Sequence, residues 1–451
     1  MRKLLFPVAL VLNACMPVAH NDTATRGIAP ASALPAMKVF AAPHPIQTVK
    51  SNRDLVQDFI ALSFELESGR ALPRFTRFEG PITVRVTGAP PASLGPDLDR
   101  LIARLRTEAG IDITRTSGPQ ASITVQAVTR DDIRNTLPDA ACFVVPNVTS
   151  LDEYRNLRRS PRTSWVSLNT REKLAIFLPN DASPQEARDC LHEELAQAIG
   201  PLNDLYRLPD SVFNDDNVHT VLTGFDMMML RAYYAPELRS GMSRAQVAAH
   251  LPAIFARINP AGQNRPAHPI SRTPRAWSDA VQTALGPGAS PRQRRIAAAQ
   301  ALDIATQMGW SDHRRAFAHY ANGRLLLSTD PNAAHMHFLQ ADRYYAATPG
   351  ADLHRAYVAT QLAAHAITQG DGTQALALIA PHLDMAARNE NAALLATLLM
   401  LQAEALDLTG DRAKARTVRV DSLGWARYGF GSDWAVRAKE REIASLNPLN
   451  G

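Results

Sequence analysis

The hydrophobic pattern of the chain changes near residue 290, and this change restricts the fold more than any other feature of the sequence. Before that point, runs of alternating apolar residues, typical of β-strands, are separated by runs with the 3.6-residue period of amphipathic helices. After it, every segment has the helical period and none alternates. The sequence therefore predicts a domain of strands and helices followed by an all-helical domain.

The first part is predicted to contain four strands and five helices. The strands are expected at residues 81–88, 111–116, 121–129 and 173–180, and the helices at 54–66, 96–110, 182–200, 223–238 and 243–259. The helix at 182–200 has the clearest limits, because Ser183 can cap its start, Pro184 suits its first turn and Gly200 can end it. This order of strands and helices is an α+β layout.

Composition marks the limits of the domains. Residues 16–50 are rich in Ala, Pro, Asn and Thr and have no hydrophobic period, so they are predicted to form a flexible tether. A second stretch, rich in Pro, Gly and Asn, follows residue 260 and marks a linker. The predicted organisation is a signal peptide at 1–15, the tether at 16–50, an α+β domain at 51–260, the linker at 261–289 and an α-helical repeat-like domain at 290–451.

The N-terminus has the features of a secretion signal. Two basic residues precede an apolar run too short to span a bilayer, and a small residue precedes Cys15. The end of this run, LNAC at 12–15, resembles the bacterial lipobox, in which the cysteine is lipidated and becomes the new N-terminus. Ordinary cleavage a few residues later is the alternative. Met16 after the cysteine implies, by the same resemblance, the outer rather than the inner membrane, so a lipid-anchored periplasmic protein is predicted.

Two cysteines, Cys142 and Cys190, remain besides Cys15. Because the periplasm is oxidising, we expect them to form one disulfide that ties the segment around residues 140–147 to the helix at 182–200. Two buried free thiols are the alternative.

The distribution of charge argues against nucleic acid as a partner. The chain has 48 Lys and Arg against 43 Asp and Glu, a formal net charge of +5. Its basic residues are scattered, whereas a nucleic-acid binder usually concentrates them on one face with aromatic residues between them. We therefore expect no nucleic-acid binding.

Two segments of the helical domain share a pattern. In TQGDGTQALALI and LTGDRAKARTVR, an alanine follows the glycine of a Gly-Asp pair by five residues, and in both cases another alanine lies seven residues before that glycine. These alanines are Ala363, Ala375, Ala403 and Ala415. The pattern resembles tetratricopeptide helix pairs, in which small residues let two helices approach closely. A plain helical bundle is the alternative, because the two copies lie farther apart than the ~34 residues of that repeat.

The segment SLGWARYGFGSDW at 422–434 is aromatic and rich in glycine. We interpret it as a packed cap on the last repeat. An exposed binding edge is the alternative interpretation.

The stretch HEELAQAIGPLND at 192–204 is the clearest functional signal. In the zincin pattern HExxH starting at His192, the second ligand would fall on Ala196, which cannot bind a metal. Starting at Glu193, the stretch is similar to the metzincin pattern HExxHxxGxxHD, with the glutamate, glycine and final aspartate present. The three histidines of that pattern are Glu, Gln and Asn here.

The metzincin resemblance assigns roles to these residues. Glu193, Gln197 and Asn203 stand at the three metal-ligand positions, and Glu194 would be the general base if activity remains. Helical spacing puts Glu193 and Gln197 on one face, one turn apart. The turn at Gly200 would bring Asn203 back toward them, so the three side chains are expected to converge on one cleft.

The resemblance continues downstream. DSVFND at 210–215 stands where matrixin-type metzincins have a Met-turn, with Phe213 in the methionine's place. The run at 222–236 is similar to the closing helix of that group, with Asp226 as an early acidic residue. The order of strands and helices upstream also matches, so the resemblance covers roughly residues 75–240 and implies a metzincin-like (zincin) fold.

The chain also resembles an uncharacterised family of proteobacterial lipoproteins that is known as a domain of unknown function. The runs CLHEELAQAIGPLND and DSVFNDD carry this resemblance. It implies no activity.

The replaced ligands change the expected metal chemistry. Zinc hydrolases rely on imidazole ligands, and the amide oxygens of Gln197 and Asn203 bind zinc poorly, so zinc is not expected. One carboxylate and two amides suit Ca²⁺ or Mg²⁺, which take six or more oxygens, and Asp204, Asp215 and Asp216 are further candidates. Water on such an ion is less acidic than on zinc, which makes the task of Glu194 harder. No other cofactor is expected.

Two histidines near the motif are interpreted as non-ligands. One helical step turns His192 about 100° away from Glu193, so we expect it beside the site or at the surface. His219 lies in a loop and is expected to be solvated, with a metal ligand as the alternative.

Three functions remain open at this point. The first is a pseudoenzyme whose metzincin-like body binds a partner, the second is a hydrolase with an altered metal or none, and the third is a purely structural polar network. We expect the first, a periplasmic lipoprotein that binds or scaffolds an envelope protein through its C-terminal helices. It would contact the membrane through its lipid only.

Overall fold

The computed structural model describes residues 34–40, 48, 50–268 and 271–450, which belong to one compact unit. The predicted signal peptide, the lipidation site Cys15 and most of the predicted tether lie outside the described residues. Within the part that is described, no helix is long and apolar enough to cross a membrane.

A five-stranded mixed sheet forms the centre of the N-terminal region, with the strand order β2-β1-β3-β5-β4. The strands are β1 (Ile82–Gly88), β2 (Ile113–Arg115), β3 (Ile123–Val128), β4 (Phe143–Pro146) and β5 (Leu174–Pro179). All neighbouring pairs are parallel except β4 and β5, where Phe143 lies opposite Phe177 in an antiparallel register. Parallel strands need crossover connections, so this region is α/β rather than the predicted α+β.

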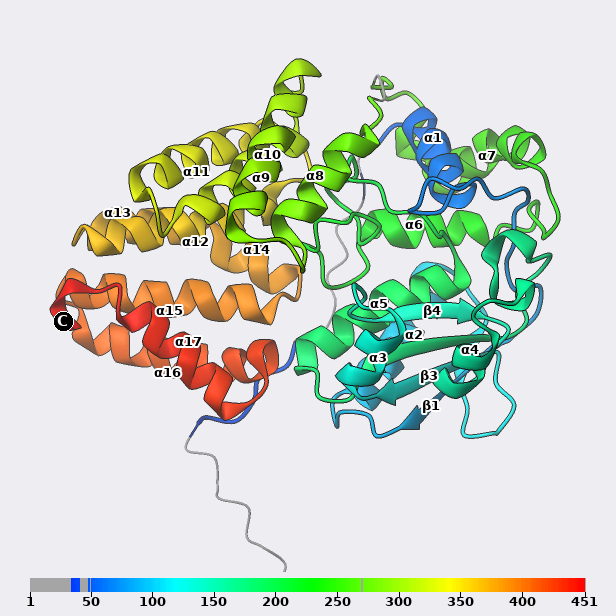
Figure 1. Cartoon of the computed structure of the whole chain (residues 1–451), viewed down its shortest axis with the longest axis horizontal. Coiled ribbons are helices and arrows are strands. Elements are labelled where there is room, and N and C mark those ends of the chain that lie inside the picture. The colour runs from blue at the N-terminus through cyan, green and yellow to red at the C-terminus, as the bar shows by residue number, and fades with distance from the viewer. Residues whose placement is uncertain (1–33, 41–47, 49, 269–270, 451) are drawn as a thin grey trace, which may run out of the picture. The chain divides into compact units, whose positions relative to one another are not determined.

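Helices cover both faces of the sheet (Figure 1). Val84, Val125 and Ile176 point into a large core that they share with five helices. These helices are α1 (Asn52–Ser63), α2 (Leu94–Glu108), α5 (Pro184–Ile199), α6 (Gly224–Tyr233) and α7 (Arg244–Ile258). On the opposite face, Ala175 and Phe177 pack with two short helices, α3 (Arg130–Thr136) and α4 (Leu151–Leu157). The four predicted strands and five predicted helices are present, whereas β4, α3 and α4 were not predicted.

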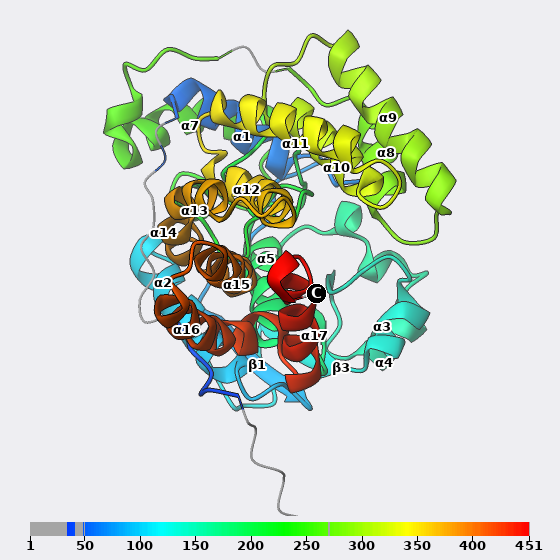
Figure 2. The same ribbon diagram turned by 90° about the vertical axis from the view of Figure 1, so that its left-hand side faces the viewer.

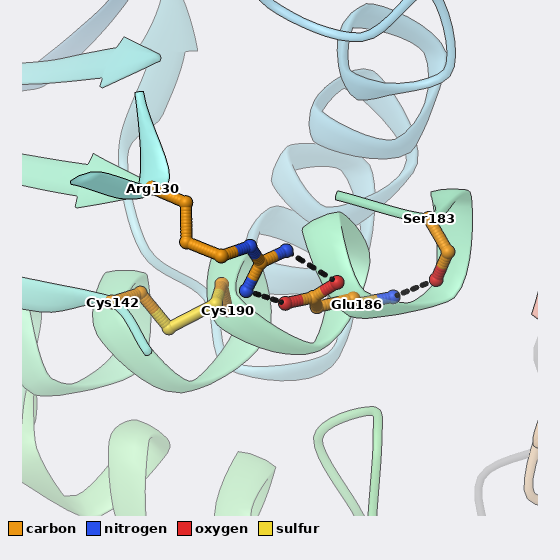
Figure 3. Close-up of a disulfide and its surroundings, with 5 residues drawn as sticks. All are labelled: Arg130, Cys142, Ser183, Glu186 and Cys190. Atoms are coloured by element: carbon orange, nitrogen blue, oxygen red, sulfur yellow. Dashed lines mark hydrogen bonds and ion pairs between the residues drawn. A yellow bond between two sulfur atoms is a disulfide. The ribbon is translucent and has the colours of Figure 1, made fainter. Parts of the chain in front are cut away.

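Three contacts fix the first half of α5 (Figure 3). Ser183 caps the helix as predicted, because its side chain accepts a hydrogen bond from the backbone N–H of Glu186 at 3.1 Å. The Glu186 carboxylate accepts hydrogen bonds of 2.8 and 3.1 Å from Arg130 at the start of α3. The predicted disulfide between Cys142 and Cys190 is confirmed. It ties α5 to the residue that precedes β4.

The C-terminal region consists of helices in the described range 271–450, and consecutive helices lie side by side (Figure 2). They are α8 (Arg275–Leu285), α9 (Pro291–Gln307), α10 (His313–Leu326), α11 (Pro331–Ala346), α12 (Asp352–Thr368), α13 (Gly372–Ile379), α14 (Leu383–Arg388), α15 (Ala392–Leu408), α16 (Arg412–Phe430) and α17 (Asp433–Ala444). Five short 3₁₀ helices complete the described secondary structure, at Pro161–Thr163, Trp165–Ser167, Pro260–Gly262, Ala380–His382 and Pro448–Asn450. The helix α8 falls inside the range predicted as a linker and packs on α9.

The two Gly-Asp pairs form the same turn between paired helices. Gly370 and Gly410 have φ angles of +77° and +89°, in the left-handed region that glycine adopts without strain. The following residues, Asp371 and Asp411, cap the next helix by accepting a hydrogen bond from a backbone N–H three residues on. The alanines that were singled out in the sequence are all fully buried, at 363, 375, 403 and 415.

A third turn of this kind carries a side chain. Glu390, between α14 and α15, has a φ angle of +51°, and Asn391 then caps α15 as the aspartates do in the other two turns. The backbone N–H of Asn391 reaches back to the Ala386 carbonyl at 3.0 Å. Glu390 therefore occupies the position of glycine in this turn.

Residues 34–40, within the range predicted as a tether, pack along α16. The Lys38 N–H donates to the Gly424 carbonyl at 3.0 Å, and the rings of Phe40 and Trp425 stack with centroids 4.5 Å apart. The aromatic segment at 422–434 therefore contains both a packed and an exposed aromatic residue. Trp425 is packed, whereas Trp434 at the start of α17 is 76% exposed.

Buried polar contacts join the helical region to α5. Arg188 donates from Nη1 to the Glu390 carboxylate at 2.8 Å, and the Arg188 side chain is only 2% exposed. Next to this pair, Gln185 bonds the Asn391 side chain at 3.1 Å and accepts from the Ala393 backbone at 2.8 Å. The two regions are thus held together by oriented charged and amide groups as well as by apolar contact.

Breaking this ion pair is expected to destabilise the whole chain. In the variant Glu390→Gln, the Arg188 guanidinium remains buried without a counter-charge, which typically costs about 3–5 kcal/mol. Urea unfolding of the full chain measures this loss. The matched control is Glu237→Gln, which removes the carboxylate from the exposed pair Glu237–Arg257 and should change the unfolding midpoint little. Equal midpoints for the two variants would contradict the structural role of the buried pair.

Candidate functional site

The motif helix α5 ends at a turn where Arg171 binds the last carbonyl groups and Leu230 packs closely against Gly200. Arg171, 2% exposed, donates hydrogen bonds to the carbonyls of Gln197, Ala198 and Gly200 at 2.6–2.8 Å. These carbonyls have no partner within the helix, so a cation is favourable here. A Cβ at Gly200 would lie 2.5 Å from Cδ2 of Leu230 in α6, so a larger residue would force this side chain to shift. Sequence reasoning identified the glycine as the helix stop but missed Arg171.

The three ligand positions of the motif have different surroundings. The Gln197 amide donates to the Asp204 carboxylate at 3.4 Å, and Asp204 in turn lies within the electrostatic reach of Glu193. The Asn203 amide instead donates to the Ala61 carbonyl of α1 at 2.9 Å. The structure therefore brings Glu193 and Gln197 toward Asp204, while the Asn203 amide nitrogen is used to hold the turn against α1.

Five carboxyl groups gather beside this part of α5. This carboxyl cluster consists of Glu67, Glu193, Glu194, Asp204 and Asp215, which interact electrostatically with one another. Oε2 of Glu194 is buried and has no hydrogen-bond partner among the described residues. The segment that carries Glu67 is far from the motif in sequence, and no local pattern marked it.

Burial and mutual repulsion raise the pKa values of the cluster. Burial, followed by the charges of Asp189, Glu67 and Asp215, raises the pKa of Glu193 to about 8. Burial and then the charges of Glu193 and Glu67 raise the pKa of Glu194 well above its ordinary value. Both groups therefore favour the protonated form near neutral pH, in which a carboxyl group is a poor general base and a poor metal ligand.

The cluster borders a cleft of about 460 Å³ between the α/β region and α8. Three carboxyl groups of the cluster line this cleft, those of Glu67, Asp204 and Asp215. Three exposed arginines also line it, namely Arg244, Arg272 and Arg275. A larger groove of about 1230 Å³ beside α8 and α9 shares Tyr206, Asp215, Asp279 and Gln282 with this cleft. The two cavities are therefore adjacent.

The segment at the Met-turn position is buried and anchored. Phe213 is fully buried, and its carbonyl accepts a hydrogen bond from the Leu205 N–H at 2.9 Å. Asp226 accepts from the Ser211 hydroxyl at 2.5 Å and from the Val212 N–H at 3.1 Å. Asp226 thus connects this segment to the start of α6, a role that its place as an early helix acid did not reveal.

The two histidines near the motif are both buried. His192 is 4% exposed, and its Nδ1 accepts a hydrogen bond from the Leu222 N–H at 3.0 Å, so the ring supports the entry to α6. The expectation that His219 is solvated was wrong. Its Nε2 lies 2.9 Å from the Pro209 carbonyl, and the ring lies beside His354 of α12, which pairs with Asp216 at 2.7 Å. The helical region therefore covers His219 within this loop.

These residues do not fit a zinc centre. Two of the three ligand positions carry amides instead of imidazoles, and amide oxygens bind zinc poorly. The amide nitrogens of these residues donate to Asp204 and Ala61. In the described ranges, no group of three or more His, Cys, Asp or Glu is arranged to hold a metal ion.

Comparison with known proteins finds one family model that matches part of the chain, and it gives no activity. A family model described as "Protein of unknown function (DUF2927)" matches residues 52–253. This span contains the sheet, the motif helix and most of α7, and it agrees with the resemblance to an uncharacterised family. No curated protein and no solved structure matches the chain.

The raised pKa values predict that the chain loses stability as the pH rises from 7.2 to 8. The folded state holds protons on Glu193 (pKa about 8) and Asp189 (pKa about 7) that the unfolded state has released in this range. Buried histidines with lowered pKa values, such as His219, oppose this trend mainly below about pH 7, because an unfolded imidazole is half protonated at ~6.5. The free energy of unfolding from urea titrations at pH 7.2, 7.6 and 8 measures the slope.

The variant Glu193→Gln should reduce this slope, because its neutral side chain has no proton to lose. Asp303→Asn, at an exposed position of α9, removes the same formal charge and serves as the control. If the Glu193 variant kept the wild-type slope, the protonated state of the cluster would be refuted.

Proposed function

We propose that this protein is a lipid-anchored periplasmic protein with a metzincin-like body that lacks zinc-dependent catalysis and binds an envelope protein. The lipid anchor and the compartment rest on the N-terminal sequence, whose LNAC ending resembles a lipobox. The disulfide between Cys142 and Cys190 supports an oxidising compartment. The family of unknown function that matches residues 52–253 brings no competing activity.

The metzincin-like body is supported by the order of its parts. The strand β1, the helix α2, the strands β2, β3 and β5 and the motif helix α5 follow one another as the resemblance requires. Then come the turn at Gly200, the buried segment at Phe213 and the helix α6. A mixed sheet behind the motif helix, with Asn203 and Asp204 after its end lining a cleft, is a suitable scaffold for such a site.

The loss of zinc catalysis rests on one observation. The three ligand positions carry Glu193, Gln197 and Asn203 in place of histidines, and the amide nitrogens of Gln197 and Asn203 donate internal hydrogen bonds. Replacing imidazoles by such groups removes the ligands that hold zinc and acidify its water.

The binding function is assigned to the C-terminal helices. Their Gly-Asp turns and fully buried alanines, such as Ala375 and Ala415, support tetratricopeptide-like packing of helix pairs. Stacked helix pairs offer extended surfaces for proteins. Trp434, 76% exposed, borders a groove of about 540 Å³ beside the start of α5, and exposed tryptophans are common anchors at protein interfaces.

Restoring the three histidines tests this proposal. Wild-type protein purified from zinc-containing medium should carry far less than one zinc per chain. The triple variant Glu193→His, Gln197→His and Asn203→His should carry about one, because the metzincin resemblance requires imidazoles at these three ligand positions. Elemental analysis of the full chain measures both, circular dichroism checks folding, and Gln197→His alone is the control. Stoichiometric zinc in the wild type would overturn the loss of zinc chemistry, and a folded triple variant without zinc would overturn the metzincin-like arrangement.

A hydrolase that uses a hard ion is the second candidate, and one buried carboxylate oxygen without a partner among the described residues favours it. Oxygen ligands suit Ca²⁺ or Mg²⁺, and Oε2 of Glu194 is buried without a partner. This function predicts cleavage of a peptide library that depends on added Ca²⁺ or Mg²⁺. Glu194→Gln should abolish that cleavage, whereas Glu186→Gln on the same helix should leave it unchanged. Absence of cleavage by the wild type under both ions would exclude this candidate.

A further inference from the structure

Two histidines from adjacent helices face each other in the C-terminal region, away from the motif. His319 of α10 and His337 of α11 have their Nδ1 atoms 3.1 Å apart, with ring centroids 5.3 Å apart. Both side chains are partly exposed, so the pair is open to solvent. Without a metal, one imidazole must donate its proton to the other across this distance.

We propose that His319 and His337 form a binding site for a divalent transition-metal ion of the zinc, nickel or copper class. Imidazole is a preferred ligand for these ions, and they bind its nitrogen at about 2.0–2.1 Å. Two nitrogens 3.1 Å apart can both reach one ion at that length, with an angle at the metal of about 100°. The ion would replace the proton that the two rings share, and water would complete its coordination.

The protonation states of the pair favour metal binding. Burial, followed by the charges of His337 and Arg315, lowers the pKa of His319 to about 4, and burial lowers the pKa of His337. Both imidazoles are therefore neutral near pH 7 and compete little for protons. Arg315 is the cation that acts on this site, and its guanidinium lies 4.9 Å from the centroid of the Tyr344 ring while donating to the Trp310 carbonyl.

The helices hold the two rings in position. Tyr344 of α11 stacks on the His319 ring, with centroids 5.7 Å apart and planes inclined by 12°. One turn after His319, a Cβ at Gly323 would lie 2.7 Å from the ring of Phe338, the neighbour of His337. Glycine therefore allows α10 and α11 to approach closely beside the pair. A site on two rigidly packed helices needs little rearrangement to bind an ion.

The same region contains a second histidine pair with a different geometry. His335 of α11 and His365 of α12 stack face to face, with centroids 4.0 Å apart and planes inclined by 23°. The nitrogens of an imidazole lie in the ring plane, so stacked rings do not direct their lone pairs at a common point. This pair provides a matched internal control, because it has the same residue type on one of the same helices.

Calorimetric titration of the untagged full chain with Ni²⁺ and with Zn²⁺ tests the proposal. The wild type should show a site whose affinity falls at least tenfold in His319→Gln and in His337→Gln. The variants His335→Gln and His365→Gln should bind as the wild type does. Equal binding by the wild type and both site variants would overturn the proposal, as would a loss of binding in the control variants.

A complementary measurement separates this site from the carboxyl cluster. The electron paramagnetic resonance spectrum of the Cu²⁺-loaded chain should show nitrogen coupling that His319→Gln removes and Glu193→Gln leaves unchanged. Coupling that survives His319→Gln would mean adventitious binding elsewhere and would refute the site. Thermal melting of each variant checks that it is folded. This result is independent of whether the motif helix carries any metal.

Discussion

A charge that is removed from water must find a partner or be neutralised, and α5 is built around this constraint. The helix carries charged residues along most of its length, yet it lies between a sheet and the helical region. Arg188 forms an ion pair with the Glu390 carboxylate, and Glu186 forms one with Arg130. Within the described part of the chain, no ion pair joins Glu193 or Glu194 to a cation, and their raised pKa values favour the neutral acids instead. One helix thus joins the two regions at its start and avoids charge near the cleft.

Local patterns in the sequence were sufficient for most of the fold. The alternating runs of β1, β2, β3 and β5 and the cap at Ser183 depend on nearby residues, and the structure has all of them. β4 was missed because its four residues, FVVP, form a short apolar run without alternation. The pairing of β4 beside β5, and hence the mixed character of the sheet, depends on contacts between distant residues.

The candidate site was predictable only in part. The spacing of Glu193 and Gln197 correctly placed them one turn apart on α5, but Glu67 and Arg171 reach the site from distant segments that carry no recognisable pattern. The burial of His219 was not predicted for the same reason. Its place in a loop indicates an exposed side chain, but His354 of the distant helix α12 packs beside it. The residues that decide protonation and access are therefore those that tertiary packing supplies.

The left-handed turn at Glu390 restricts which residues can replace it without weakening the contact between the two regions. Glycine would adopt this backbone angle more readily, as Gly370 and Gly410 do in the two sister turns. It would also delete the carboxylate that holds Arg188. The backbone conformation at residue 390 thus favours glycine, whereas the contact between the two regions needs the glutamate. A substitution to glycine would ease the turn but remove the ion pair between α5 and the helical region.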